Sequence, residues 1–307
     1  MSEPFSVVSL AIAGGRGRIS SLAPAAAPLE AQQLIAAGLT LLQRSAPLVR
    51  ALSGYRSAIL LPASPSWFVA LAASEGRGAL LLDPSSTIEE VDARCAAARV
   101  GALFTIASMA AMAPPGVAIV LLDDAPNHAR VLAGHREQQV DLGSHHGLSL
   151  EAAHDVPGRN EEAMLAHDVT GSRESPTSWS HAALLAEARA AARVACYETG
   201  DVVLSLLPFS RPRSFCCGVL APLLAGAHVV ASADSPMTSQ RIVLADQATV
   251  VYGSASHYER LLREMHRRAS PLPPRALRRC LCEGPAVPRD LAERWALQTN
   301  LSLEPIG

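Results

Sequence analysis

The sequence predicts an α/β protein built from two doubly wound subdomains, and three observations support this prediction. Short apolar runs typical of buried strands alternate with longer segments of helical spacing from residue 57 to residue 122. Such alternation indicates a parallel sheet with helices on its faces. A Leu-Pro corner, an apolar helix and a closing Gly over residues 61–78 recur over residues 207–226, which indicates two related subdomains. The third observation is the length, since 307 residues suffice for two domains and a large core.

The first subdomain is expected over residues 29–157, after a strand, turn and linker segment over residues 1–28. Helical spacing of Leu and Ile predicts a helix over residues 29–52, with a break or kink at Pro47. Apolar runs predict strands at residues 57–61, 79–82, 102–106 and 117–122.

Two helix starts in this subdomain can be read from capping residues. Ser64, followed by Pro65, is the predicted N-cap of the helix after the first strand. Thr87 and Glu90 have the spacing of a capping box at the start of the next helix.

A polar stretch over residues 123–157 separates the two halves. It holds five histidines, His128, His135, His145, His146 and His154. A metal site is one interpretation of so many imidazoles. The spacings are irregular and no Cys lies nearby, which favours a solvated surface connection, and we assign no metal ligand.

The second subdomain is expected over residues 158–307. A helix is predicted over residues 180–196, and strands are predicted at residues 249–252, 279–282 and 300–304. An amphipathic helix is expected between the first two of these strands.

Composition excludes several classes of partner. The net charge is −2, so neither nucleic acid nor an anionic membrane is expected as a partner. No apolar run has the length of a bilayer span, and a cytoplasmic location is the expectation. The six cysteines lack zinc-site spacing and are expected to be reduced thiols. All 26 basic residues are arginines, because the sequence contains no lysine.

The loop before the predicted helix at residue 180 is rich in small polar residues. Residues 166–181 read AHDVTGSRESPTSWSH. A small-residue loop that leads into a helix N-terminus can bind an anion, because backbone N–H groups point outward there. An ordinary linker before a helix capped by Ser180 is the alternative interpretation. No GxSxG nucleophile elbow occurs, which argues against a serine hydrolase.

Four segments of the chain resemble the adenylate-forming superfamily of acyl-CoA and aryl-acid synthetases. The last of them, CLCEGPAVPRDLAERWALQTNLSLEPIG, is similar to the family's GGAPLPPELAERFxxxxGxxLxxxYGxTE. Residues 166–181 are similar to its phosphate loop, with Thr170 and Gly171 as the TG and His181 closing the SH. The segment ILLPASPSWFVALAASEGRGALLLDPSSTIEEV resembles a segment of the first subdomain. The segment DVVLSLLPFSRPRSFCCGVLAPLLAGAHVV is similar to the family's LPFSHSYGLxxGLLAPLLAGATVV, with Arg211 in place of the His and Ser214 in place of a Gly.

The resemblance implies a fold and a set of site residues. The implied fold is the large N-terminal domain, which has two flavodoxin-like subdomains in αβαβα layers and a crevice between them. The C-terminal lid domain, with its lysine, is expected to be absent from the 307 residues. The implied groups are Thr170, Gly171, Ser172, Arg173 and Ser175 around phosphate; Arg211, Phe215, Cys216 and Gly253 around the acyl group; and Glu283, Gly284 and Pro285 near adenine. No catalytic residue is assigned.

The resemblance also implies a chemistry, in which a small carboxylic acid is activated with ATP and transferred to the thiol of CoA or of an acyl carrier protein. The implied cofactors are ATP or AMP and Mg²⁺. Without a lysine the chain is expected to be incomplete or inactive alone, so that a separate chain could supply the C-terminal domain. The alternative is a pseudoenzyme, a non-catalytic module that binds an acyl or aryl ligand or serves in assembly. Glu174 and the missing lysine favour the alternative, since a carboxylate repels phosphate and a guanidinium does not replace an ammonium.

Overall fold

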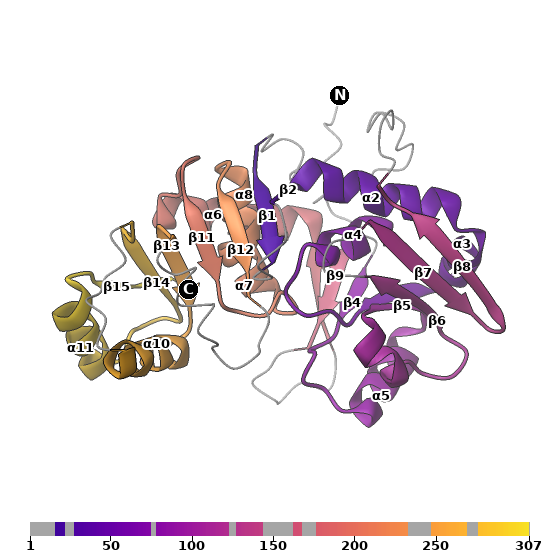
Figure 1. Ribbon diagram of the computed structural model, residues 1–307. Helices are drawn as coiled ribbons and strands as arrows, with labels where there is room; N and C mark the ends of the chain where they lie inside the picture. Colours follow the sequence, from indigo (N-terminus) through magenta and orange to yellow (C-terminus); the bar gives the residue numbers. More distant parts are fainter. Residues whose placement is uncertain are drawn as a thin grey trace.

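The computed structural model describes residues 16–21, 28–74, 78–122, 127–143, 162–167, 176–232, 247–268 and 276–306. Two sheets stand side by side with helices between them and on their outer faces (Figure 1). α5 covers the outer face of one sheet, and α10 and α11 cover the outer face of the other. The arrangement confirms the predicted α/β class and its αβαβα layers.

The larger sheet has eight strands. Their order across the sheet is β10 (Thr177–Ser180), β9 (Glu162–Ala166), β4 (Ala79–Leu81), β3 (Arg56–Ile59), β5 (Val100–Thr105), β6 (Ala118–Leu122), β7 (His128–Ala133) and β8 (Arg136–Asp141). Strands β9, β4, β3, β5 and β6 pair in parallel, whereas β10, β7 and β8 add to the two edges in antiparallel fashion. The parallel strands are nearly continuous runs of buried Ala, Leu, Ile and Val, as expected where both faces are covered.

The second sheet has seven strands. Their order is β15 (Leu303–Ile306), β14 (Arg279–Glu283), β13 (Val250–Gly253), β11 (Val202–Ser205), β12 (His228–Ala231), β1 (Arg18–Ser21) and β2 (Leu29–Glu30). All neighbours pair in parallel except β1 and β2, which are antiparallel.

Sheet membership does not follow the order of the chain. β1 and β2, from the start of the chain, complete the sheet of the second subdomain by pairing with β12. β9 and β10, which follow residue 157, complete the sheet of the first subdomain by pairing with β4. The expected domain limits at residues 28 and 157 therefore divide the sequence at points where neither sheet is complete.

Part of the polar stretch at residues 123–157 is a hairpin, which the sequence analysis did not predict. β7 and β8 pair over six residues each around a turn at Gly134 and His135. Every second residue of β7 from Ala129 is buried or half-buried, and this alternation is the signal that the interpretation as a surface connection overlooked. His145, His146 and His154 lie outside the described residues.

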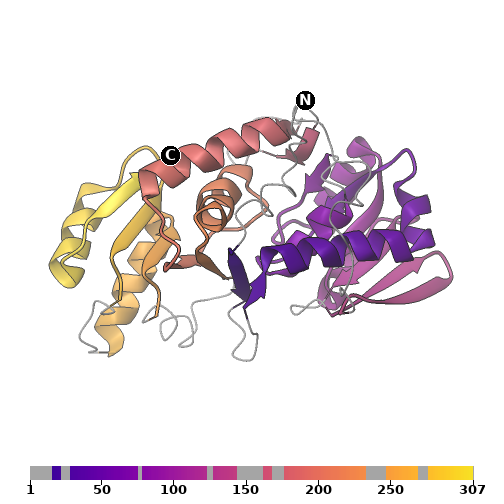
Figure 2. The same cartoon turned by 90° about the horizontal axis from the view of Figure 1, so that it is seen from above.

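The helices between the sheets come from both subdomains. They are α2 (Ala31–Arg44), α3 (Ala46–Leu52), α4 (Ser66–Ala73), α6 (His181–Ala195), α7 (Pro212–Phe215), a π-helical turn (Cys216–Leu220) and α8 (Ala221–Leu224). Seen from above, α2 crosses the half that holds the eight-stranded sheet, and the long helix α6 runs along one side of the half that holds the seven-stranded sheet (Figure 2). The outer helices are α5 (Ile88–Ala98), a 3₁₀ turn (Ala107–Met112), α10 (Ala255–Arg268) and α11 (Arg289–Thr299). None of the described helices is both long and apolar enough to cross a membrane.

Two of the three helix boundaries discussed for the first subdomain agree with the prediction from the sequence. The helix expected over residues 29–52 breaks at Ser45, whose Oγ accepts the amide N–H of Leu48, and Pro47 lies in the first turn of α3. Thr87 and Glu90 form the capping box of α5. Ser64 is not an N-cap, because α4 starts after Pro65 and the buried Ser64 Oγ has no partner among the described residues.

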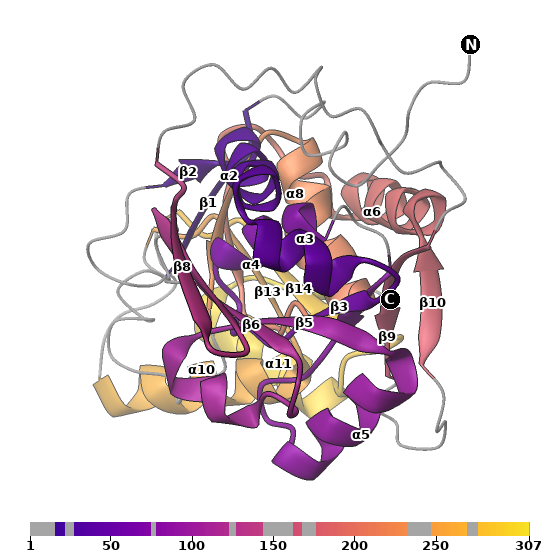
Figure 3. The same cartoon turned by 90° about the vertical axis from the view of Figure 1, so that its right-hand side faces the viewer.

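The apolar core has three parts, one between the two sheets and one on the outer face of each sheet. The largest lies between the two sheets and is filled from both subdomains. At its centre Phe215 packs against Trp67, with ring centroids 4.5 Å apart, and lies 5.8 Å from Phe68 and 6.0 Å from Phe209. Viewed along the row of layers, α4 lies in front of the strands of the second sheet (Figure 3). The aromatic cluster therefore joins α4 of the first subdomain to α7 of the second.

Gly38 lets α2 and α4 approach closely, and Gly38→Ala is expected to destabilise the protein. A Cβ at residue 38 would lie 2.5 Å from the carbonyl oxygen of Val69 and 2.6 Å from Cβ of Ala72. Overpacking of this kind costs about 1–3 kcal/mol, more than Ala gains over Gly in helix propensity. Urea unfolding followed by circular dichroism measures the change. Gly200→Ala is the control, since a methyl group at residue 200 would have no other atom within 4 Å, and equal stabilities of the two variants would contradict the prediction.

Candidate active site

The candidate site lies at the carboxyl ends of the central strands of the seven-stranded sheet. β11, β13 and β14 end side by side at Ser205, Gly253 and Glu283. Ligands of open α/β sheets bind outside this end of the strands. The helical segment that follows β11 begins here, so that its first residues face the same edge.

A carboxylate held by two hydroxyl groups forms the centre of the site. Oε1 of Glu283 accepts a hydrogen bond from Ser214 Oγ at 2.6 Å and one from Tyr252 OH at 2.9 Å. Ser214 comes from α7, Tyr252 from β13 and Glu283 from β14, so three elements fix one oxygen atom. No hydrogen bond of the other carboxylate oxygen is found within the described ranges, which leaves it able to accept one from a ligand.

Tyr252 reaches this carboxylate because the helical segment beside it has no side chain at residue 218. A Cβ on Gly218 would lie 2.4 Å from the Tyr252 ring and 2.7 Å from Ser205 Oγ. Gly218 lies within the π-helical turn, a form of helix that is frequent at functional sites. Burial, followed by the adjacent Glu283 carboxylate, raises the pKa of Tyr252, so its hydroxyl stays protonated and donates.

Two glycines at the strand ends shape the rim of the site. Gly253 is buried, and a Cβ there would lie 3.2 Å from both His257 Cβ and Leu206 Cδ1. Gly284 has φ +128°, a conformation that only glycine adopts readily, and a Cβ there would have its nearest neighbour 4.0 Å away. Pro285 is exposed beyond it. The rim beside Glu283 is therefore formed by backbone atoms of Gly253 and Gly284, which no side chain of these two residues covers.

Arg211 carries a polar atom that the described residues leave unsatisfied. Its backbone precedes α7, and its Nε is buried without a hydrogen-bond partner among them. The same holds for Ser210 Oγ beside it in the chain. An unpaired buried donor costs about 1–3 kcal/mol, so this pair of donors suits an acceptor such as a carboxylate or phosphate oxygen.

Phe215 and Cys216 lie in the core. Both are 0% exposed, Phe215 in the aromatic cluster and Cys216 with its thiol donating to the Leu184 carbonyl oxygen at 3.4 Å. Burial, with smaller effects of Cys217 and Glu187, raises the pKa of the Cys216 thiol well above its usual value, which makes it a poor nucleophile. Their role as lining of an acyl pocket stays a prediction.

The residues that the sequence assigned to the site can be compared with those that the structure places there. The five phosphate-loop residues, Thr170, Gly171, Ser172, Arg173 and Ser175, lie outside the described residues. Arg211, assigned to the acyl group, and Glu283, assigned to the surroundings of adenine, belong to segments that meet at the same sheet edge, and both assignments stay predictions. Ser214 and Tyr252 were not assigned to the site. The signal for Ser214 was its place in the chain, where the family has a glycine, and Tyr252 gave no signal beyond its position before Gly253.

Comparison with known proteins agrees with the fold. Residues 178–303 match the family model of the AMP-binding enzymes. Apo MatB from Rhodopseudomonas palustris is similar in structure, with a TM-score of 0.71 and 17% identity over 96% of this chain and 58% of that one. A benzoate CoA ligase from Burkholderia xenovorans LB400 gives a TM-score of 0.73 and 17% identity over 97% and 60%. No curated protein sequence matches the chain.

A third similar structure is a long-chain-fatty-acid-CoA ligase, FadD1, from Archaeoglobus fulgidus, with a TM-score of 0.72 and 13% identity over 98% of this chain and 63% of that one. The whole chain therefore has the fold of the corresponding part of these three ligase structures. Residues 178–303, which lie in the second subdomain, match the AMP-binding enzyme family model. The chain spans about 58% of the length of MatB and 60% of that of the benzoate CoA ligase.

Proposed function

We propose that this chain binds a small carboxylic acid at the edge formed by Arg211, Ser214 and Glu283, within a ligase-like protein that activates the acid with ATP. The observation that supports the proposal most directly is the buried, unpartnered Nε of Arg211 beside that edge, where the described residues supply no acceptor. A guanidinium N–H donates well to a carboxylate, and low surrounding polarity strengthens the contact.

In the proposed reaction a carboxylate oxygen of the acid attacks the α-phosphorus of ATP. A P–O bond forms, the bond to pyrophosphate breaks, and a thiol of CoA or of an acyl carrier protein then displaces AMP. The chain contributes by orienting the acid and by offsetting its charge at Arg211. ATP, AMP and Mg²⁺ enter this proposal by family resemblance alone, with the phosphate loop expected at residues 170–175 as the place for phosphate.

We further propose that the chain does not complete adenylate formation by itself. It has no lysine anywhere in its 307 residues, and arginine does not replace an ammonium group as a compact point charge. A separate chain that carries a C-terminal domain would then be a partner. The non-catalytic alternative, a module that binds an acyl or aryl ligand, is favoured by Glu174 in the expected phosphate loop, because its carboxylate would repel phosphate.

Titration calorimetry and pyrophosphate exchange over a panel of carboxylic acids test both statements. We expect at least one acid to bind, no exchange by the chain alone, and a loss of affinity of about tenfold or more for Arg211→Gln, since a charge-assisted hydrogen bond contributes about 1.5–3 kcal/mol. Arg213→Gln is the matched control, because Arg213 is exposed and pairs with Glu187 at 3.0 Å.

Three results distinguish the two proposed functions. Pyrophosphate exchange by the isolated chain would contradict inactivity. Binding of an acid with no binding of ATP–Mg²⁺ would favour the non-catalytic module. Equal affinities of the Arg211→Gln and Arg213→Gln variants would remove Arg211 from the site.

A further inference from the structure

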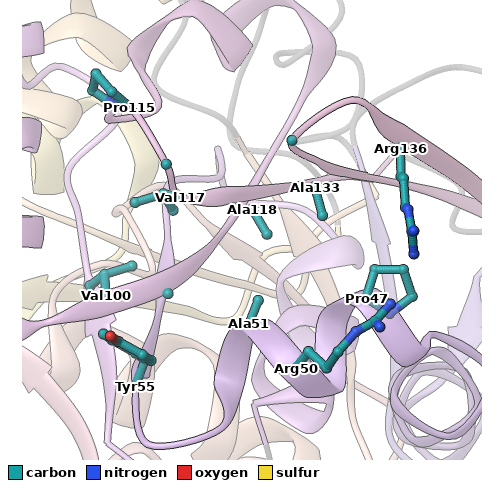
Figure 4. Close-up of a pocket in the computed structure, with 13 residues that line it drawn as sticks. Pro47, Arg50, Ala51, Tyr55, Val100, Pro115, Val117, Ala118, Ala133 and Arg136 are labelled. Carbon is teal, nitrogen blue, oxygen red and sulfur yellow. The ribbon is translucent and has the colours of Figure 1, made fainter.

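A pocket of about 590 Å³ lies beside the eight-stranded sheet, whereas the candidate active site lies at the seven-stranded sheet. Its walls are α3 with the turn that follows it, the first residues of β5 and β6, and the hairpin β7–β8 (Figure 4). Val100 and Ala118 begin their strands, so the pocket is at the amino ends of the parallel strands. It shares no residue with the site around Glu283.

The charged lining of this pocket is positive. Its charged members are Arg50 from α3 and Arg136 from β8, and no Asp or Glu belongs to the lining. Figure 4 shows the two arginine side chains extending toward the same side of the pocket, on either side of Pro47. No carboxylate pairs with either guanidinium within the described part of the chain, whereas Arg130 on the same hairpin pairs with Glu137 at 3.4 Å. Both guanidinium groups are permanently positive, so the two together attract an anion to this side of the pocket.

The rest of the lining provides a shallow apolar floor and one aromatic ring. Its small residues are Ala51, Gly101, Gly116, Ala118, Ala133 and Gly134. Tyr55 is 54% exposed at the rim, with the Arg99 guanidinium 5.9 Å from its ring centroid. A volume in this range is typical of small-molecule sites, and a flat apolar body fits against a ring and small side chains.

We propose that this pocket binds a small aromatic anion, with its charged oxygens between Arg50 and Arg136 and its ring beside Tyr55. The charged group is a carboxylate or a phosphate ester, both of which two guanidinium groups bind well. This pocket is separate from the candidate active site, which lies at the carboxyl ends of the strands of the seven-stranded sheet.

Calorimetry with phenyl phosphate and with benzoate, on the full chain at low salt, tests the proposal and distinguishes the two headgroups. We expect saturable binding of at least one probe that weakens as NaCl is raised, because screening reduces an exposed ionic contact. Arg50→Gln and Arg136→Gln are each expected to weaken binding about tenfold. Phenol, which lacks the charge, should bind more weakly than phenyl phosphate.

Two controls make the result decisive. Arg130→Gln removes the same charge from the same hairpin and should change the Kd by less than about twofold. Arg211→Gln should leave the Kd for phenyl phosphate unchanged, and a loss there would place phenyl phosphate at the active site and overturn the proposal. No saturable binding by the wild-type chain, or an equal effect of all three pocket and hairpin variants, would also overturn it. Circular dichroism melts confirm that each variant is folded.

Discussion

Phe215→Ala is expected to lower the free energy of unfolding by about 3–5 kcal/mol, the usual cost of removing a buried phenyl ring. Phe215 is 0% exposed and contacts three aromatic side chains, of which Trp67 and Phe68 come from the other subdomain. Removal of the ring leaves a cavity between two helices that are fixed by separate sheets, so little collapse can fill it. Urea unfolding monitored by Trp fluorescence and by circular dichroism measures the loss.

Two comparisons sharpen this result. Leu297→Ala is the control, because Leu297 is 88% exposed and its removal should change stability by less than about 0.5 kcal/mol. Phe215→Leu keeps most of the volume and should recover much of the loss. If Phe215→Ala weakened acid binding and left stability intact, Phe215 would be pocket lining and the assignment to the core would be wrong.

Asp201→Ala is the second large effect, with an expected loss of about 3 kcal/mol, because it removes a buried carboxylate and leaves the partly buried Arg278 guanidinium with Glu198 at 3.7 Å as its remaining ion-pair partner. The Asp201 side chain is 4% exposed and pairs with Arg278. It also accepts hydrogen bonds from Thr249 Oγ1 and from the Glu198 amide N–H, both at 2.7 Å. The matched control is Asp290→Ala, since Asp290 pairs with Arg294 at 3.1 Å on the surface of α11 and should contribute less than about 1 kcal/mol.

The same carboxylate predicts the direction of a pH effect. Burial acts to raise the pKa of Asp201, but the hydrogen bonds from Arg278, Thr249 and Glu198 outweigh it, and the net pKa is lowered. A carboxyl group with a lowered folded-state pKa stabilises the protein above its unfolded value of about 3.9 and loses that contribution as the pH falls through the folded value. The difference in unfolding free energy between wild type and Asp201→Ala should therefore be constant above about pH 5 and narrow as the pH falls below about 4. A difference that stays constant below about pH 4 would contradict this.

The sequence predicted the layers and most elements because each carries a local signal. Thr87 with Glu90 fixed the start of α5, and Pro47 marked the break between α2 and α3. The prediction that Ser64 is the N-cap was wrong, because Pro65, with αR dihedral angles, takes the N-cap position and α4 starts at Ser66. The hairpin β7–β8 was overlooked because charged residues on its exposed face hide the alternation that buries Ala129, Val131 and Val140.

The site was only partly predictable. Arg211 and Glu283 were identified by resemblance, and the structure brings their segments to one edge. Ser214 and Tyr252 could not be assigned from the sequence, because their role depends on which strands become neighbours and on the missing side chain of Gly218. A carboxylate held by two hydroxyl groups from different elements is a tertiary feature without a local pattern.

The exchange of strands between the two halves has a consequence for how the chain folds. β1 pairs with β12 across about 210 residues, with Arg18 opposite His228 and Ser21 opposite Ala231. During synthesis β1 has no pairing partner until residues 228–231 of β12 have left the ribosome. Closure of so long a loop is entropically costly and slow. Until the two strands pair, their edges can mispair with a neighbouring chain. We therefore expect this topology to make the protein dependent on chaperones during expression.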